Sequence, residues 1–275
     1  MIENLLFLAT PFAAVVILAG ILSYFGTHIL SRGIIFIDIA IAQIAALGTM
    51  IGLLLGYPEE SFQVQLISYT FTLLVITLFA LTKSRKPFIP QEAVIGIIYC
   101  LGLALALLLA EKIPGGSNYI TKTITGNILW VTWGKVLKCF LLFSAIGIIH
   151  LLFGKTFKNI SLNNQNTNNL IREKAYDLLF YLTFGIVIVK SVLIGGIFLV
   201  FILLIAPAAT STLFTGNWRG RIIWSWIIGI AGSIIGILLS YSLDISNGPA
   251  IVCLLGLFVF VLAFIRLMLP NSISE

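Results

Sequence analysis

Two polar side chains interrupt the apolar stretch "FIDIAIAQIAALG" at residues 36–48, namely the carboxylate of Asp38 and the amide of Gln43. An ionised carboxylate in apolar surroundings costs several kcal/mol unless it meets water, a partner or a cation. Carboxylate oxygens bind divalent cations well, whereas a neutral amide oxygen binds them more weakly. The two residues are therefore candidates for contact with a cation at depth in an apolar environment.

Both side chains also have a structural interpretation. Asp38 stands near the start of its apolar run, so it could lie in the first turn of a helix and pair with Arg32. Gln43 could form an interhelical hydrogen bond, which is worth about 1 kcal/mol in a membrane. The sequence leaves both interpretations open. Small residues of the same run predict a smooth face for close helix packing, at Ala42, Ala45, Ala46, Gly48, Gly52 and Gly56.

The apolar environment extends over nearly the whole chain. Of its 275 residues, 60% are hydrophobic and 9% are charged, against a charged fraction of about 25% in soluble domains. Apolar runs of about 20 residues, which cross about 30 Å of hydrocarbon as helices, recur with short connectors between them. The sequence predicts an all-α polytopic transmembrane helical bundle, with residues 1–275 as a single transmembrane domain.

Nine spans are expected, with eight as the alternative, because two of the apolar runs are short. Between these two runs, "VKSVLIGG" places Lys190 near Gly195 and Gly196, as in a tight or broken connection. The first run has no basic residue before it, so we expect it to be retained as a span. The expected spans are residues 5–30, 33–55, 62–82, 91–111, 131–153, 175–190, 193–210, 221–242 and 248–267.

The distribution of basic residues predicts the orientation of the bundle. With the amino terminus outside and the carboxyl terminus inside, 11 of the 16 Lys and Arg residues fall in the inner half, as the positive-inside rule requires. The other five are Lys112, Lys122, Lys135, Lys138 and Lys190. The net charge of +6 therefore indicates orientation and not nucleic-acid binding. Residues 154–174 are polar and Asn-rich, and we expect a cytoplasmic connector there.

Common catalytic motifs are absent from the sequence. It contains no G-x-x-x-x-G-K-[ST] phosphate loop, no H-E-x-x-H pair and no G-x-S-x-G elbow. Its two histidines, His28 and His150, each stand at the inner end of an expected span, where a packing role is favoured over ligation. We therefore expect that this chain is not an enzyme and holds no tight cofactor.

Five stretches in order resemble the membrane subunits of ATP-binding-cassette importers for zinc, manganese and iron. The similarity covers nearly the entire chain. It implies a permease of the bacterial cytoplasmic membrane, with divalent metal as cargo. It also implies three protein partners: a separate ATPase, an extracytoplasmic metal-binding protein and a second permease copy. The stretches are "SRGIIFIDIAIAQIAALG" (31–48), "QEAVIGIIYCLGLALALLL" (91–109), "TGNILWVTWGKVL" (125–137), "GGIFLVFILLIAPAATSTLF" (195–214) and "LSYSLDISNGPAIV" (239–252).

The resemblance also implies where the ATPase binds. In such permeases a span ends at a proline, and the segment after it forms short cytoplasmic helices that dock on the ATPase. Here this segment begins at Pro207 and extends to about Arg221. A local interpretation of Pro207 also exists, because proline lacks a backbone donor and ends helices. The expected coupling residues are Pro207, Ala208, Ala209, Thr210, Ser211, Thr212, Leu213 and Phe214.

The expected metal path departs from the family pattern. Metal permeases of this family commonly show "GDALSHALLPG" in the second span, with Asp and His four residues apart. Aligned on Gly48, the histidine position holds Gln43 and the aspartate position holds Ile39. Asp38 comes one position earlier, about 100° around the helix. Three explanations follow: Gln43 lines a path with transient metal contacts, Asp38 takes the role of the missing acid, or the cargo differs.

Two other classes of transporter remain as alternatives. A secondary transporter driven by protons or sodium could use Asp38 as its proton carrier, but such proteins are built from inverted repeats with charged residues in broken helices, which the sequence does not show. An importer of a metal chelate, such as a siderophore or cobalamin, would share the coupling to an ATPase and carry a bulkier cargo. Membrane lipid is the surrounding solvent in every case.

Overall fold

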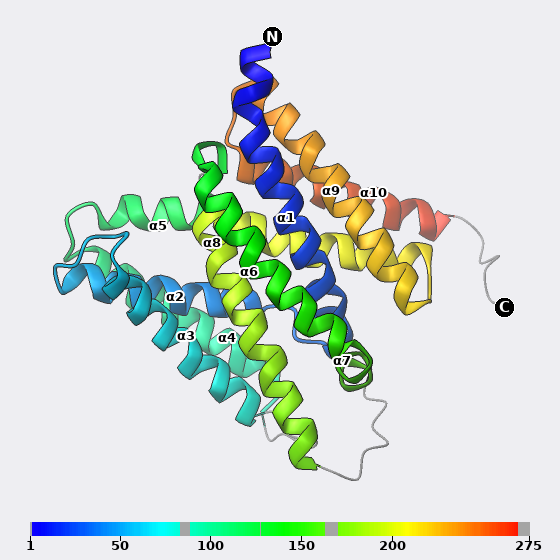
Figure 1. Ribbon diagram of the computed structural model, residues 1–275, viewed down its shortest axis with the longest axis horizontal. Coiled ribbons are helices and arrows are strands. Elements are labelled where there is room, and N and C mark those ends of the chain that lie inside the picture. The colour runs from blue at the N-terminus through cyan, green and yellow to red at the C-terminus, as the bar shows by residue number, and fades with distance from the viewer. Residues whose placement is uncertain (1, 83–88, 127, 163–169, 269–275) are drawn as a thin grey trace.

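The computed structural model describes residues 2–82, 89–126, 128–162 and 170–268, and these form a bundle of helices without a strand (Figure 1). The predicted basic loop at Lys83, Arg85 and Lys86 lies outside the described residues. The helices are α1 Ile2–Arg32, α2 Ile37–Leu54, α3 Phe62–Thr82, α4 Gln91–Ala110, α5 Gly116–Thr125, the 3-10 helix η1 Ile128–Trp130, α6 Trp133–Leu152, α7 Gly154–Ser161, α8 Leu170–Phe214, α9 Trp218–Leu243 and α10 Asn247–Met268.

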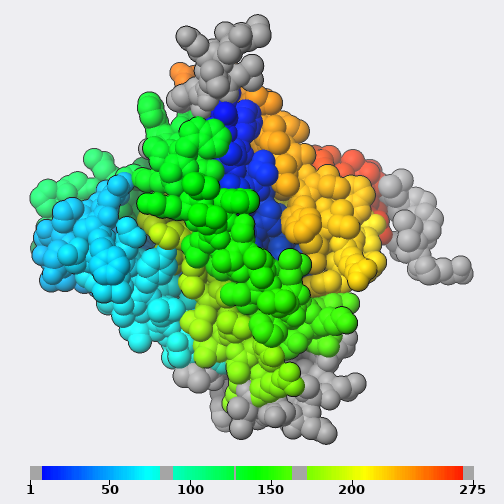
Figure 2. Space-filling model, in the orientation of Figure 1, coloured from blue at the N-terminus to red at the C-terminus, as the bar shows by residue number. Residues whose placement is uncertain are grey.

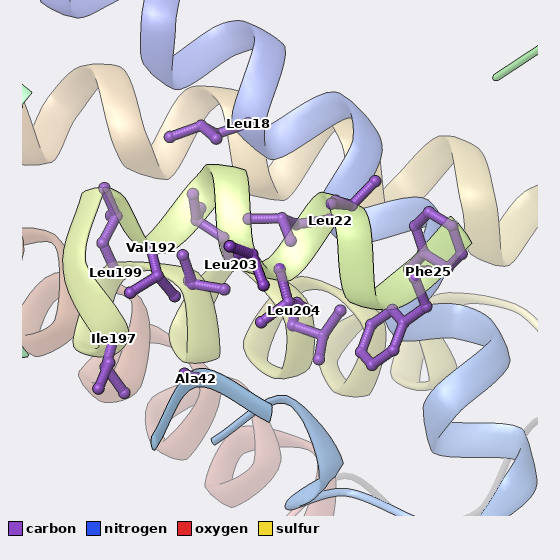
Figure 3. Close-up of a cluster of buried hydrophobic side chains, with 14 of the residues drawn as sticks. Leu18, Leu22, Phe25, Ala42, Val192, Ile197, Leu199, Leu203 and Leu204 are labelled. Atoms are coloured by element: carbon purple, nitrogen blue, oxygen red, sulfur yellow. The ribbon is translucent and has the colours of Figure 1, made fainter. Parts of the chain in front are cut away.

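Helix α8 lies at the centre of the bundle and packs against α1, α2, α3, α9 and α10 (Figure 1). Close to the turn in α8, Leu18 of α1 lies near Leu199, and further along Phe25 of α1 lies near Leu204 (Figure 3). A glycine allows this contact to be tight, since a Cβ atom on Gly26 would collide with the carbonyl oxygen of Leu204. The apolar core of the protein is therefore built around α8.

Helix α8 turns back on itself at Gly196, whose φ of 75° and ψ of 168° are not helical. Its 45 residues would extend to about 68 Å as one straight helix, which is twice the thickness of the hydrocarbon layer. Before the turn, Phe184 packs on Phe25 of α1 with ring centroids 5.4 Å apart. After it, Leu204 reaches the neighbouring Gly26. The two halves of α8 therefore run in opposite directions at the same depth.

Among the described residues, eight helices are long and apolar enough to span a membrane, and α8 is one of them. The turn at Gly196 divides α8 into two halves, which correspond to the expected pair of short spans at 175–190 and 193–210. Counted with α8 as two spans, the described helices give the nine spans that were expected, and counted with α8 as one they give the eight of the alternative. The other span boundaries lie within about four residues of the predicted ones.

The turn at Gly196 is held at the outer end of the bundle by backbone contacts between glycines. A Cβ atom on Gly196 would lie 2.6 Å from the Cα of Gly126, in the loop after α5. One on Gly195 would lie 2.7 Å from a methyl group of Leu199. One on Gly248, at the start of α10, would collide with the carbonyl oxygen of Thr125. Three segments distant in sequence thus meet at this end.

Helix α2 presents the predicted smooth face to α3. A Cβ atom on Gly48 would lie 2.7 Å from the Cα of Ser68, and one on Gly52 would lie 2.9 Å from a methyl group of Val64. The Ser68 hydroxyl also donates to the carbonyl oxygen of Ala45 at 2.9 Å. Close packing of this face is therefore confirmed at Gly48 and Gly52, and most of α2 is buried. Gly56 lies beyond the end of α2, is exposed and has no neighbour within 4 Å, so the prediction was wrong at that position.

The segment predicted as a polar connector, residues 154–174, begins with a helix instead. Helix α7 occupies Gly154–Ser161 and buries Phe157 and Ile160 against the bundle, and α8 already begins at Leu170. The two apolar side chains on one face explain the helix, because burying them stabilises a segment that is otherwise polar. Residues 163–169 of this connector lie outside the described residues.

The backbone at Gly196 yields the first testable prediction. Gly196→Ala should destabilise the protein, because its φ and ψ suit only glycine and the added methyl group meets the Gly126 backbone. A strain of about 1–3 kcal/mol corresponds to a fall in Tm of about 2–10 °C. Thermal unfolding in detergent measures it. Gly147→Ala in α6, where nothing lies within 4 Å, is the matched control and should keep or slightly raise the Tm. Equal Tm values for the two variants would contradict this account of the turn.

Candidate translocation path and inner surface

Asp38 lies in the first turn of α2 and is buried, with 1% of its surface exposed. Its Oδ1 atom has no hydrogen-bond partner among the described residues. The loop before it, residues 33–36, turns at Gly33 with a φ of 68°. This loop is fixed to α4 by the backbone N–H of Ile35, which donates to the Glu92 carboxylate at 2.5 Å. Asp38 is therefore a carboxylate held at depth on a fixed element.

Arg32 does not pair with Asp38, which corrects one of the two interpretations drawn from the sequence. Its guanidinium Nη1 donates to Asp177 of α8 at 2.5 Å, and its Nε donates to the Ser161 hydroxyl of α7 at 3.0 Å. Both partners in the ion pair are buried. The sequence analysis missed Asp177, although an acidic residue inside the expected span 175–190 was a signal for such a pair.

Gln43 is also buried, at 5% exposure, and faces α4. A Cβ atom on Gly102 of α4 would lie 3.3 Å from the Gln43 Cβ, so the two helices pack closely at this point. An offset of five residues places Asp38 and Gln43 about 140° apart around α2 and about 7.5 Å apart along it. The two side chains leave the helix in different directions and do not form one common site.

Asp38 shares its face of α2 with the small residues that lead towards the outer end. At offsets of four, seven and eleven residues come Ala42, Ala45 and Thr49, which lie on one helical stripe with it. These three line a small cavity of about 50 Å³. Thr49 also lines a larger outer cavity of about 530 Å³. The buried carboxylate thus stands at the inner end of a stripe of small side chains that reaches the outer cavity.

The two histidines are packed inside the protein among aromatic side chains and hydroxyl groups. His28 and the Ser161 hydroxyl share a hydrogen bond of 2.8 Å. His150 is hydrogen-bonded to the hydroxyls of Tyr24 at 3.1 Å and Thr183 at 2.8 Å. Within the described residues, no three His, Cys, Asp or Glu side chains come together as a metal site. The histidines therefore have the structural role that the sequence favoured.

The helix does not end at Pro207, contrary to the sequence expectation. Helix α8 continues through this proline to Phe214, and a turn at residues 215–217 leads into α9. Ala208, Thr210 and Ser211 are buried. The carbonyl oxygen of Leu203 has no helical donor, because Pro207 lacks an N–H, and it accepts from the Ser23 hydroxyl of α1 at 3.4 Å. A proline is tolerated inside this helix because α1 packs against it and supplies a side-chain donor.

The exposed part of the expected coupling segment is shorter than predicted and lies at the inner end of the bundle. Thr212 is exposed, and so is Phe214, whose ring stacks on Trp224 with centroids 4.6 Å apart. Arg266 of α10 donates to the Leu213 carbonyl oxygen at 2.6 Å. We call residues 212–217 the inner surface turn. All six of its residues are exposed or partly exposed, whereas most of residues 207–211 are buried.

Two ion pairs connect the outer ends of the helices. Lys122 of α5 pairs with Glu59 and Lys135 of α6 pairs with Glu60, both at 3.0 Å. The hydrogen bond from Lys135 and its positive charge lower the pKa of the Glu60 carboxyl below its ordinary value, so Glu60 stays ionised at neutral pH. Asp244 adopts a left-handed conformation at the end of α9, as a turn residue does.

A bundle of apolar spanning helices, with a carboxylate at depth and an exposed turn at its inner end, defines a multi-pass membrane transport protein. The chain belongs to the ABC 3 transport family, whose model matches residues 4–266.

Individual proteins resemble this chain at low identity. It is 27% identical over 174 residues to a "Probable metal transport system membrane protein" of Chlamydia muridarum, a match covering 61% of this chain and 57% of that protein. A protein of the same description from Chlamydia trachomatis is 27% identical, over 87% of this chain and 81% of that one. "Manganese transport system membrane protein MntC" of Halalkalibacterium halodurans is 27% identical, in a match covering 94% of this chain and 86% of that protein.

A solved structure shares the fold. "PsaBC from Streptococcus pneumoniae in complex with Fab" superposes with a TM-score of 0.77 at 22% identity, covering 96% of both chains. Because the match covers nearly all of both chains, the two proteins share the arrangement of their helices.

The pair between Arg32 and Asp177 yields the second prediction. Arg32→Met should lower the free energy of unfolding by about 3–5 kcal/mol, because it leaves the Asp177 carboxylate buried without its counter-charge. The double variant Arg32→Met/Asp177→Leu should recover most of that loss, since neither charge then remains. Unfolding in detergent at several temperatures measures both. Lys122→Ala, which breaks an exposed pair, is the control and should cost less than about 1 kcal/mol. Additive losses in the double variant would show that the two charges do not interact.

Proposed function

We propose that this chain is the membrane permease subunit of an ATP-driven importer of divalent metal ions, namely zinc, manganese or iron. Its membership of the ABC 3 transport family over residues 4–266 carries the proposal. The names of its relatives, which are metal and manganese transport system membrane proteins, support a metal as cargo. The chain forms the path through the bacterial cytoplasmic membrane, and hydrolysis of ATP takes place in another subunit.

The proposed mechanism needs three partners. A second copy of this chain completes the translocation unit, because transport by alternating access is achieved by the movement of two bodies against each other. An extracytoplasmic metal-binding protein delivers the ion at the outer end. A separate ATP-binding-cassette subunit docks on the inner surface turn, where Phe214 presents an exposed aromatic ring to it. The absence of a phosphate loop in the sequence is the reason for this last partner.

Asp38 is the residue that we assign to contact with the cation. Its carboxylate is buried, Oδ1 has no hydrogen-bond partner among the described residues, and its helical stripe leads to the outer cavity. Carboxylate oxygens are ligands for manganese and iron as well as for zinc. Gln43, which faces α4, would contribute only a neutral oxygen during passage. The site is therefore weak, as suits a path that must release each ion it admits.

A secondary transporter is the main alternative, and the energy source separates the two. The permease is co-purified with an ATPase and a binding protein and is placed in proteoliposomes loaded with a metal-sensitive dye. We expect uptake of manganese or zinc that requires ATP and persists when a proton ionophore collapses the gradient. Uptake that proceeds without the ATPase and stops with the ionophore would reject the proposal.

The same vesicles test the inner surface turn. Phe214→Ala should lower ATP-driven uptake at least tenfold at equal ATPase concentration, because the exposed ring is removed from the docking surface. ATP hydrolysis by the assembled complex should no longer respond to the loaded binding protein. Phe140→Ala in α6, where an exposed ring is likewise removed from another helix, is the matched control and should transport normally. Full coupling in the Phe214 variant would place the docking surface elsewhere.

Asp38 yields the prediction for the path itself. Asp38→Asn should lower metal uptake at least tenfold, while Tm holds or rises, since a buried acid without an ion-pair partner among the described residues is replaced by a neutral amide that can still accept from the nearby backbone. Gln43→Leu should reduce uptake less, in line with its neutral side chain. Asp244→Asn, in the outer turn, serves as the control. If Asp38→Asn lowers Tm and leaves uptake intact, the carboxylate has a structural role and not a transport role.

A further inference from the structure

Two cavities at the outer end of the bundle share part of their walls. The larger, of about 530 Å³, opens between α3 and α6, where Figure 2 shows a yellow-green strip of α8 between the cyan and green surfaces. The smaller, of about 50 Å³, is lined by Ala42 and Ala45 from the helical stripe that begins at Asp38. An ion that moves from the larger cavity to this stripe therefore passes the residues that the two cavities have in common.

The shared wall contains an ion pair between Glu59 and Lys122. Glu59 belongs to the loop between α2 and α3, Lys122 belongs to α5, and the carboxylate accepts from the ammonium group at 3.0 Å. Within the described part of the chain, no other charged side chain lines the small cavity. The entrance to the stripe thus holds one carboxylate, and a cation supplied by the chain itself is bound to it.

The neighbouring pair of Glu60 and Lys135 has the same geometry and a different position. Its atoms are also 3.0 Å apart, and the Lys135 side chain is 57% exposed, against 56% for Lys122. Both Glu60 and Lys135 line the larger cavity, and neither lines the smaller one. The two pairs therefore differ in whether they stand at the entrance to the stripe.

Three hydroxyl groups line the small cavity together with Glu59, and their hydrogens are already in use. Thr49 and Ser68 both donate to the Ala45 carbonyl oxygen, at 3.1 and 2.9 Å, and Thr123 donates to a backbone carbonyl of its own helix at 2.9 Å. Because a hydroxyl oxygen carries two lone pairs, these groups can still act as oxygen ligands. One carboxylate with neutral oxygens and water suits manganese and other hard divalent cations.

A divalent cation is able to displace the Lys122 ammonium group from Glu59. At equal distance from a carboxylate, an ion of charge two is attracted twice as strongly as an ammonium group. The pair to be broken is weak, because the side chains are 56% and 45% exposed and exposed ion pairs contribute little to stability. An ion at so exposed a position also keeps part of its water. A monovalent ion has the same charge as the ammonium group and lacks this advantage.

We propose that Glu59 is the entry ligand of the translocation path, and that Lys122 is a tethered counter-ion which an arriving divalent cation displaces. The inference rests on the proposed function and names the position at which the cargo ion enters. Before an ion arrives, the ammonium group occupies the carboxylate at the entrance. After the exchange, the cation lies between Glu59 and the hydroxyls of Thr49 and Ser68, and Lys122 is released. The entrance thereby selects ions of charge two over ions of charge one.

The rate of acetylation of Lys122 reports whether the pair is open. The purified full-length protein in nanodiscs of neutral phosphatidylcholine is treated briefly with an acetyl N-hydroxysuccinimide ester, and the modification of each lysine is quantified by mass spectrometry. We expect manganese chloride to raise the acetylation of Lys122 about two- to fivefold, because the small stability of an exposed pair limits the gain. Lys135 is the internal control and should not respond.

Potassium chloride at equal ionic strength is the second control. It should change the acetylation of Lys122 and Lys135 equally, since it only screens their charges. Equal responses of the two lysines to manganese chloride would overturn the proposal, and so would the absence of any response of Lys122.

Two substitutions separate the entry ligand from a general effect of acidic groups. Glu59→Gln should raise the basal acetylation of Lys122, which loses its partner, and abolish the response to manganese, with Tm unchanged. Glu60→Gln is the matched control and should keep the response of Lys122 in full. A Glu59→Gln protein in which manganese still raises the acetylation of Lys122 would overturn the assignment.

The vesicle experiment distinguishes failure of the entry site from failure of the proposed function. Glu59→Gln should lower ATP-driven uptake of manganese by about tenfold, the usual cost of losing a group at a metal site, and Glu60→Gln should leave it unchanged. ATP-driven uptake that is the same in both variants, with no response of Lys122 to manganese, would keep the importer and reject the entry site. A manganese response of Lys122 without any ATP-driven uptake would keep the site and reject the importer.

Discussion

The absence of a Cβ atom at the outer turn is the constraint on which the rest of the bundle depends. Gly196 reverses the chain inside what would otherwise be one overlong helix, and the backbone of Gly126 lies against it. A spanning segment must satisfy its polar backbone groups within itself, so a reversal at this depth requires very close backbone neighbours to exclude lipid. Both halves of α8 then reach the core beside α1.

Much of the architecture follows from the sequence, because apolar length and small-residue spacing are strong signals in membranes. The spans, their order and the smooth face of α2 were predictable, and the suspected break near Gly195 and Gly196 is the turn in α8. Two features were not. The helix through Pro207 depends on the Ser23 hydroxyl of α1, a contact between distant residues, and α7 depends on the burial of Phe157 against the bundle.

The polar residues at depth illustrate the same limit. Sequence alone indicated that the Asp38 carboxylate required either an ion-pair partner or a functional role, and Arg32 was the nearest basic residue in the chain. In the structure Arg32 pairs with Asp177, which is 145 residues away in the sequence. Asp38 therefore does not have the ion-pair partner that its position in the sequence suggested. The clustering of outer lysines was likewise hidden, since Lys122 and Lys190 belong to elements that meet only after folding. Charge neutralisation inside a membrane is decided by tertiary neighbours and not by spacing along the chain.

Arg32 joins three helices through one side chain. It reaches α7 at Ser161 and α8 at Asp177, and it belongs to α1 itself. These three segments are thereby joined at one buried point, where the guanidinium also lies 3.7 Å from the centre of the Phe180 ring. The four-residue link at 33–36 follows Arg32 directly and is itself bonded to α4 through Ile35 and Glu92. The position of Asp38 in space is therefore set from both sides, by the residues that hold Arg32 and by the helix that holds the link.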